Sequence, residues 1–80
     1  MSRTPLRWIR AFDAEVGARI RARRLQLGLT HHRLARDLGM SVQELQAYER
    51  GDERVPAPTL EKFAKTLSIT TLALLPTTKR

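Results

Sequence analysis

Hydrophobic residues recur at helical intervals along most of the chain. In three stretches an apolar residue returns every three, four or seven positions: Val16, Ile20 and Leu27, then Leu34 and Leu38, then Leu60, Phe63, Ala64 and Leu67. Residues at these intervals lie on one face of an α-helix, whereas a half-buried strand alternates with a period of two. No stretch of the sequence shows that alternation. The pattern therefore predicts an all-α fold.

Capping residues predict where the first helices begin and end. Asp13 is a suitable N-cap for a first helix that runs to about Leu27, and Gly28 supplies a C-terminal stop. Thr30 can cap a second helix that ends at Gly39. Both helices are therefore bounded by residues suited to helix ends.

A third helix is expected from Ser41 to Arg50, immediately before Gly51. Ser41 and Glu44 have the spacing of a capping box, in which each side chain bonds the backbone amide of the other residue. This helix start is the clearest in the sequence.

The C-terminal part of the chain predicts two more helices. One begins near Pro56–Thr59, where proline is tolerated in a first turn, and buries the last of the apolar stripes. Thr70 can cap a short fifth helix through Leu75, which Pro76 stops. We therefore expect an N-terminal extension over residues 1–12, one helical domain over 13–75 and a flexible tail over 76–80.

The segment before Asp13 has two open interpretations. Thr4 followed by Pro5 is a helix-start signal, and four large apolar residues follow: Leu6, Trp8, Ile9 and Phe12. These side chains either cover the core of their own domain or form part of a subunit interface. A short extra N-terminal helix fits both interpretations.

The charge of the chain points to a polyanionic partner. The 80 residues are enough for one domain with one core, and their formal net charge is +7. Residues 1–28 carry seven arginines and two carboxylates, whereas residues 29–50 carry three of each. A basic chain of this size most often binds nucleic acid.

The sequence lacks the groups that most enzymes and metal sites use. It has no cysteine, and its only histidines, His31 and His32, are adjacent and so point in different directions on a helix. No carboxylate pair or glycine-rich phosphate loop has a suitable spacing. We expect no enzyme activity, no metal and no cofactor. The longest apolar run, Leu72–Leu75, is far shorter than the roughly 20 residues of a membrane span, so a cytoplasmic protein is expected.

The segment from Thr30 to Gly51 has the spacing of two short helices joined by a tight turn. Gly39 can adopt the left-handed conformation that such a turn needs, and the small Ala35 lets the two helices approach each other. The inner face of this unit is expected to hold Leu34, Leu38, Met40, Leu45 and Tyr48.

Four sequence blocks, RIRARRLQLGLT, LARDLGMS, LQAYERG and LEKFAKTLSI, follow one another between about Val16 and Leu75. In order and separation they resemble the helix-turn-helix domain of lambdoid phage repressors and related bacterial regulators of the XRE family. The resemblance implies a compact five-helix domain whose third helix enters the major groove of double-stranded DNA. It implies a sequence-specific transcriptional regulator, a repressor, from a bacterium or a phage. The alternative is a protein–protein interaction module such as the antitoxin of a toxin–antitoxin pair.

The resemblance makes the outward face of the third helix the candidate base-reading surface. Once the apolar residues of this helix face the core, four side chains remain outward: Val42, Gln43, Gln46 and Ala47. Gln43 can bond adenine through two hydrogen bonds, while Val42 and Ala47 can contact thymine methyl groups.

Candidate phosphate contacts lie at the starts of the second and third helices. Backbone amides near Thr30 and His31 attract anions, and Ser41 is a further candidate. The family usually has glutamine where this chain has His31, so the alternative is a solvent-exposed histidine.

Arginines supply further candidates, each with an alternative. In the family, basic or polar residues after the third helix contact phosphate, but here Asp52 and Glu53 precede Arg54. Either Arg54 makes the contact or this loop does not touch DNA. Three arginines of the first helix either contact phosphate or form a solvated helix face: Arg19, Arg21 and Arg23.

Two further features are implied by the resemblance. Arg24 and Glu49 match a family ion pair that joins the first helix to the end of the third, the alternative being two independent surface charges. One inserted helix reads too few base pairs to select a site, so we expect a homodimer that pairs mainly on a palindromic operator. The interface is expected around Ser68–Leu75. Its candidate residues are Ile69 and Leu72, with Trp8 and Phe12.

Overall fold

The computed structural model describes the backbone of residues 6–76 and the side chains of residues 10–76. This part of the chain contains four α-helices and no strand: α1 (Leu6–Gln26), α2 (His31–Leu38), α3 (Val42–Arg50) and α4 (Ala57–Thr66). A single 3₁₀ turn, η1 (Leu72–Leu74), follows them. The predicted all-α class is confirmed, but the prediction of five helices is wrong.

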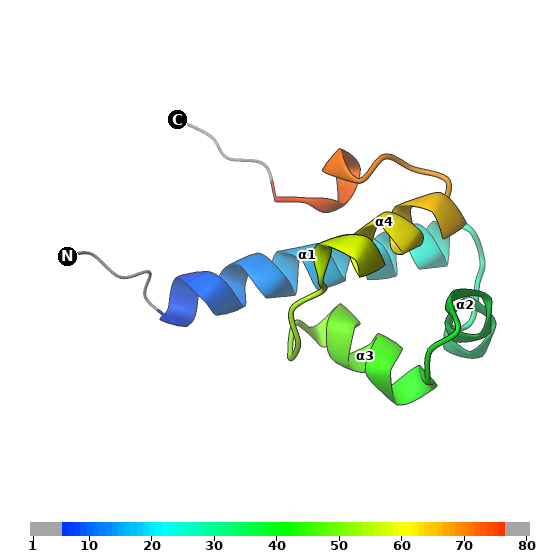
Figure 1. Cartoon of the computed structure of the whole chain (residues 1–80), viewed down its shortest axis with the longest axis horizontal. Coiled ribbons are helices and arrows are strands. Elements are labelled where there is room, and N and C mark those ends of the chain that lie inside the picture. The colour runs from blue at the N-terminus through cyan, green and yellow to red at the C-terminus, as the bar shows by residue number, and fades with distance from the viewer. Residues whose placement is uncertain (1–5, 77–80) are drawn as a thin grey trace.

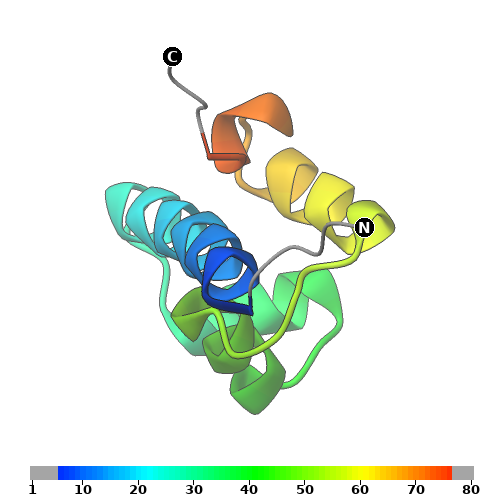
Figure 2. The same ribbon diagram turned by 90° about the vertical axis from the view of Figure 1, so that its left-hand side faces the viewer.

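The helices form a small bundle around α1 (Figure 1). α2 and α3 lie on one side of α1 and η1 lies on the other, while α4 packs against α2 (Figures 1 and 2). The contacts between elements agree with this arrangement, since α1 touches both α3 and η1 while α2 touches α3 and α4. As a result α3 lies at one edge of the molecule, with one side packed and the other open.

The apolar stripes predicted from the sequence meet in one core. The largest fully buried side chains come from every element: Ile20, Leu34, Leu45, Phe63, Leu67 and Leu74. Tyr48 of α3 packs edge-on against Phe63 of α4, with ring centroids 6.0 Å apart and an interplanar angle of 86°. Edge-to-face packing is a favoured aromatic geometry, and this pair locks α3 to the bundle.

The N-terminal end of α1 differs from the prediction. The helix already runs from Leu6, so the predicted start at Asp13 is wrong. Residues 6–12 contain no glycine or proline to break the helix, and the Asp13 carboxylate accepts a hydrogen bond from Arg54 Nε instead of capping its own helix. Leu27 was expected on the inner face, but α1 ends at Gln26 and Leu27 is 41% exposed.

The turn between α2 and α3 forms as predicted. Thr30 Oγ1 accepts from the Arg33 amide, and Gly39 ends α2 with a left-handed φ of 72°. Ser41 Oγ accepts from the Glu44 amide at 3.0 Å. The second bond of the expected capping box is replaced, because the Glu44 carboxylate accepts from Tyr48 Oη at 3.4 Å.

The expected fifth helix is only a 3₁₀ turn. The amides of Ala73, Leu74 and Leu75 each donate to the carbonyl three residues earlier. Pro76 follows at once, so the segment is too short to continue as an α-helix. The turn buries Leu74 against the core and leaves Leu72 outside. The tail predicted over residues 76–80 lies, apart from Pro76, outside the described residues.

Candidate nucleic-acid interface

The open side of α3 presents a polar surface. Gln43 is exposed, and Gln46 and Ala47 are partly exposed, as expected for outward positions. Val42 is less free than expected, because it packs partly against the core. Arg50 follows Gln46 by four residues and Gln43 by seven, so it lies on the same face, and its side chain is 63% exposed. Arg50 was not among the predicted site residues, although the helical spacing could have identified it.

A buried ion pair holds α3 against α1. Arg24 Nε lies 2.8 Å from Glu49 Oε2, and Arg24 Nη2 lies 3.2 Å from Glu49 Oε1. Both residues are more than 90% buried, so they are not the independent surface charges of the alternative interpretation. Arg24 Nη1 also donates to the Leu29 carbonyl at 2.9 Å, which ties the loop before α2 to the same group.

His31 joins this network from α2. Its Nε2 lies 2.9 Å from Glu49 Oε1, and its side chain is 30% exposed. The imidazole is therefore held inside the domain on one side and reaches solvent on the other. Glu49 connects α1, α2 and α3 through Arg24 and His31.

A close backbone approach completes the contact between α1 and α3. A Cβ atom added at Gly17 would lie 2.3 Å from the Tyr48 carbonyl oxygen and 2.5 Å from that of Glu49. No side chain larger than hydrogen fits at this distance. Gly17 thus lets α1 lie directly on the last turn of α3.

The arginines of α1 divide between two sides of the helix. Arg21 borders a hollow of about 170 Å³ together with His31, Gln46, Glu49 and Arg50. Residues two positions apart are rotated by roughly 200° on an α-helix, so Arg19 and Arg23 lie on the other side. Of the three arginines proposed to contact phosphate, only Arg21 lies beside α3.

Arg19 and Arg23 make contacts within the domain. Arg23 donates from Nε to the Leu67 carbonyl at 2.9 Å and from Nη2 to that of Ser68 at 3.4 Å, which satisfies carbonyls at the end of α4. Arg19 pairs with Glu15 at 2.9 Å. The structure therefore places both at a distance from the open side of α3.

Arg54 also makes contacts within the domain. Its Nε donates to Asp13 Oδ1 at 2.9 Å, and its guanidinium carbon lies 5.5 Å from the centre of the Phe12 ring. The loop after α3 is thus fastened to α1, and the phosphate contact of Arg54 stays a prediction.

The residues proposed for a dimer interface are exposed to different degrees. Leu72 is 77% exposed and Phe12 is 42% exposed, whereas Ile69 is partly buried against its own core. The side chain of Trp8 lies outside the described residues.

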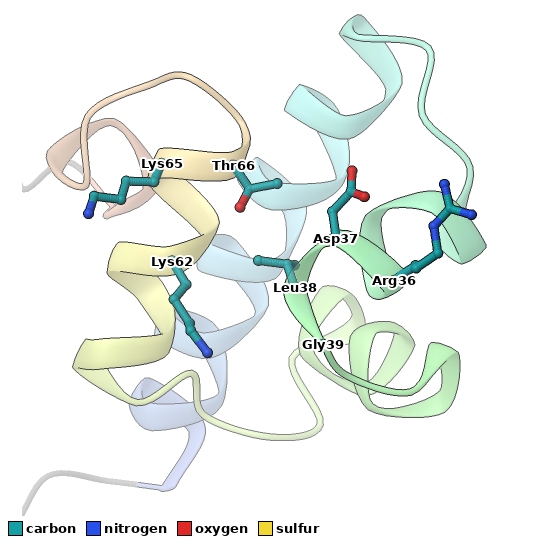
Figure 3. Close-up of a pocket in the computed structure, with 7 residues that line it drawn as sticks. All are labelled: Arg36, Asp37, Leu38, Gly39, Lys62, Lys65 and Thr66. Atoms are coloured by element: carbon teal, nitrogen blue, oxygen red, sulfur yellow. The ribbon is translucent and has the colours of Figure 1, made fainter.

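A second basic hollow, of about 320 Å³, lies between the C-terminal turns of α2 and α4 (Figure 3). Lys65 points away from α2, and the guanidinium of Arg36 lies on the far side of Asp37 from both Lys62 and Lys65 (Figure 3). Arg36 and Lys65 also occupy the last turns of their helices, where cations offset the partial negative charge of the helix end. These cations do not converge on one point, and we assign no ligand to the hollow.

Searches for similar proteins agree with the geometry around α3. Residues 15–75 match a family described as a helix-turn-helix domain. A protein of Rhodospirillum rubrum named as a transcriptional regulator in the ATPase CF(0) region is 44% identical over 69 residues, and the match covers 86% of this chain and 64% of that protein. The chain thus spans less than two thirds of the length of that relative.

Several solved structures have similar folds, among them BldD and HppE. The DNA-binding domain of BldD has a TM-score of 0.76 and 29% identity, covering 82% of this chain and 96% of that one. HppE also has a TM-score of 0.76, with 26% identity, but the match covers 81% of this chain and only 36% of the longer HppE chain. Because one fold can serve different functions, the function must be argued from the site.

Proposed function

Because the chain belongs to the helix-turn-helix domain family, we propose that it is a sequence-specific regulator of transcription that binds double-stranded DNA. The observation that carries this proposal is the setting of α3. Its buried side is fixed to α1 by the Arg24–Glu49 pair, and its open side presents Gln43 and Gln46. A rigid, exposed helix of this kind fits the DNA major groove.

Base recognition is assigned to the open side of α3. Gln43 is the main candidate because its exposed amide can donate to adenine N7 and accept from adenine N6. Gln46 is a second polar candidate, and Ala47 can contact a thymine methyl group. Val42 is proposed for an apolar contact only through the part of its side chain that the core leaves open.

Phosphate binding is assigned first to backbone amides. The amides at the start of α2, after Thr30, and at the start of α3, after Ser41, have no partners within their helices except where the caps accept them. Arg21 adds a positive charge beside the hollow near His31. His31 Nε2 lies 2.9 Å from a carboxylate oxygen of Glu49, so this nitrogen is engaged within the domain. We therefore propose His31 mainly as a positioning residue for Glu49.

The proposed assembly on DNA is a homodimer that acts as a repressor by covering its operator. Two copies related by a twofold axis place their α3 helices about 34 Å apart, one turn of DNA, so half-sites lie about 10 base pairs apart. The exposed Leu72 offers apolar surface for the contact, with Phe12 as a second contributor. The role proposed is binding, not catalysis.

Selection of bound sequences from a random duplex pool tests this function. The account predicts recovery of a palindromic motif that binds roughly 10³-fold or more tightly than random DNA. Sedimentation of the complex should then show two chains per operator. Recovery of no motif, with weak binding that is equal on all duplexes, contradicts the proposal and favours the protein-binding alternative.

A further inference from the structure

The first turns of α1 lie outside the region that matches the helix-turn-helix family. α1 is helical from Leu6, whereas the match begins at residue 15. In Figure 1 this end of α1 projects beyond α3 and α4. The described side chains of this end of α1 begin at Arg10.

This projecting end is fastened to the end of α3. A Cβ atom added at Gly51 would lie 2.5 Å from Ala14 Cα, so the backbone after α3 touches α1 directly. The Arg54–Asp13 bond and the stacking of Arg54 on Phe12 add a second attachment. The turn of α1 that follows Arg10 is therefore fixed against the end of α3.

A hollow of about 320 Å³ lies at this junction, lined by Arg10, Ala14, Arg50, Gly51 and Asp52. Arg10 is exposed and takes part in none of the ion pairs formed by the described residues. Asp52 accepts from Arg50 Nε at 2.9 Å. A guanidinium has five N–H donors, so this bond leaves the other nitrogens of Arg50 able to bind an anion. Two guanidinium groups against one carboxylate leave the hollow positively charged.

This hollow adjoins the hollow at Arg21, because Arg50 borders both. Arg10 and Arg21 are 11 residues apart, close to three helical turns, so they share one side of α1 about 16 Å apart. The three arginines therefore form a row along the α1–α3 junction, on the side where α3 is open.

We infer that Arg10 and Arg50 bind a DNA backbone phosphate at the C-terminal end of α3, in the hollow between that end and the projecting end of α1. The inference rests on the proposed function. An oxyanion suits the site because guanidinium groups bind phosphate through paired hydrogen bonds, and a flexible arginine tolerates any base sequence there. The contact lengthens the footprint on DNA and adds affinity without adding base preference.

The salt dependence of DNA binding tests the site. Arg10→Ala and Arg50→Ala are each compared with Arg19→Ala, a matched loss of charge nine residues from Arg10 and so on the opposite side of α1. Each of the first two should flatten the slope of log K against log salt by about 0.9, while Arg19→Ala leaves it unchanged. Arg10→Lys should restore most of the slope. Ethylation interference on the selected operator should map the Arg10 and Arg50 effects to the same phosphate, outside the bases that α3 reads.

The outcomes separate this site from the proposed function. If Arg10→Ala behaves like Arg19→Ala while the wild-type protein binds its operator, the phosphate site is wrong and the DNA-binding function stands. If the wild-type protein selects no duplex, both are wrong. Circular dichroism of each variant confirms that the fold is retained, as expected for exposed side chains.

Discussion

Arg24 of α1 and Glu49 of α3 are joined by two hydrogen bonds, of 2.8 and 3.2 Å, and both residues are buried. A buried ion pair contributes little net stability compared with apolar side chains, but loss of one partner leaves the other charge buried. The pair therefore fixes the position of α3, and loss of either residue is expected to destabilise the fold.

Glu49→Gln should lower the free energy of unfolding by about 3 kcal/mol, because Arg24 keeps its charge and loses its counterion. Urea unfolding at low temperature measures the change. Glu15→Gln is the control, since its pair with Arg19 is exposed and should contribute under about 1 kcal/mol. Equal small effects of the two substitutions would show that the buried pair does not hold α3.

Gly17→Ala should destabilise the domain by about 2 kcal/mol or more, because the new methyl group meets backbone oxygens that cannot rotate away. Gly28→Ala is the comparison. Its Cβ meets nothing within 4 Å, and only its φ of 68° opposes the change, at about 1 kcal/mol. The prediction fails if Gly17→Ala is the milder of the two in thermal unfolding.

Ser68→Gly should stabilise the domain by about 0.5 to 1 kcal/mol. Ser68 follows α4 with a φ of 58°, a conformation that glycine adopts without strain. Ala18→Gly, at an exposed position inside α1, should instead destabilise by about 1 kcal/mol. Denaturant unfolding measures the change in the free energy of unfolding for both variants. A loss of stability in Ser68→Gly would contradict the argument.

Alkaline pH should weaken the fold through Tyr48. Burial raises the pKa of Tyr48 above its ordinary value of 10.0, and the carboxylates of Glu44 and Glu53 act in the same direction. The unfolded chain then loses the phenolic proton before the folded protein does, so the stabilisation is complete below about pH 10 and declines as the pH rises further. Tyr48→Phe should show a smaller decline in unfolding titrations over this range. Parallel declines in the two proteins would contradict the prediction.

The sequence was most informative where one residue decides a local conformation. Thr30, Gly39 and Ser41 were enough to place the ends of α2 and α3, because caps and left-handed turns depend on neighbouring backbone atoms. The stripe ending at Leu67 likewise placed the buried face of α4.

The sequence was less informative where distant segments compete for the same side chain. Asp13 has the properties of an N-cap, yet it binds Arg54, which is 41 positions away. The sequence around Arg21 and Arg23 does not distinguish their roles. In the structure Arg23 donates to the Leu67 carbonyl at the end of α4, whereas Arg21 lies beside α3. The partner of each of these side chains depends on tertiary packing, which cannot be inferred from the local sequence pattern.

The most direct test of α3 as the base-reading helix is the affinity of Gln43→Ala for the selected operator and for all its single base-pair variants. The account predicts a loss of about 1 to 3 kcal/mol that is confined to one base pair of each half-site, with relaxed preference there and unchanged affinity for random DNA. Glu61→Ala, an exposed change on α4, serves as the control and should bind like the wild type. Equal losses on the operator and on random duplexes would contradict the assignment of base reading to Gln43 and to the open side of α3.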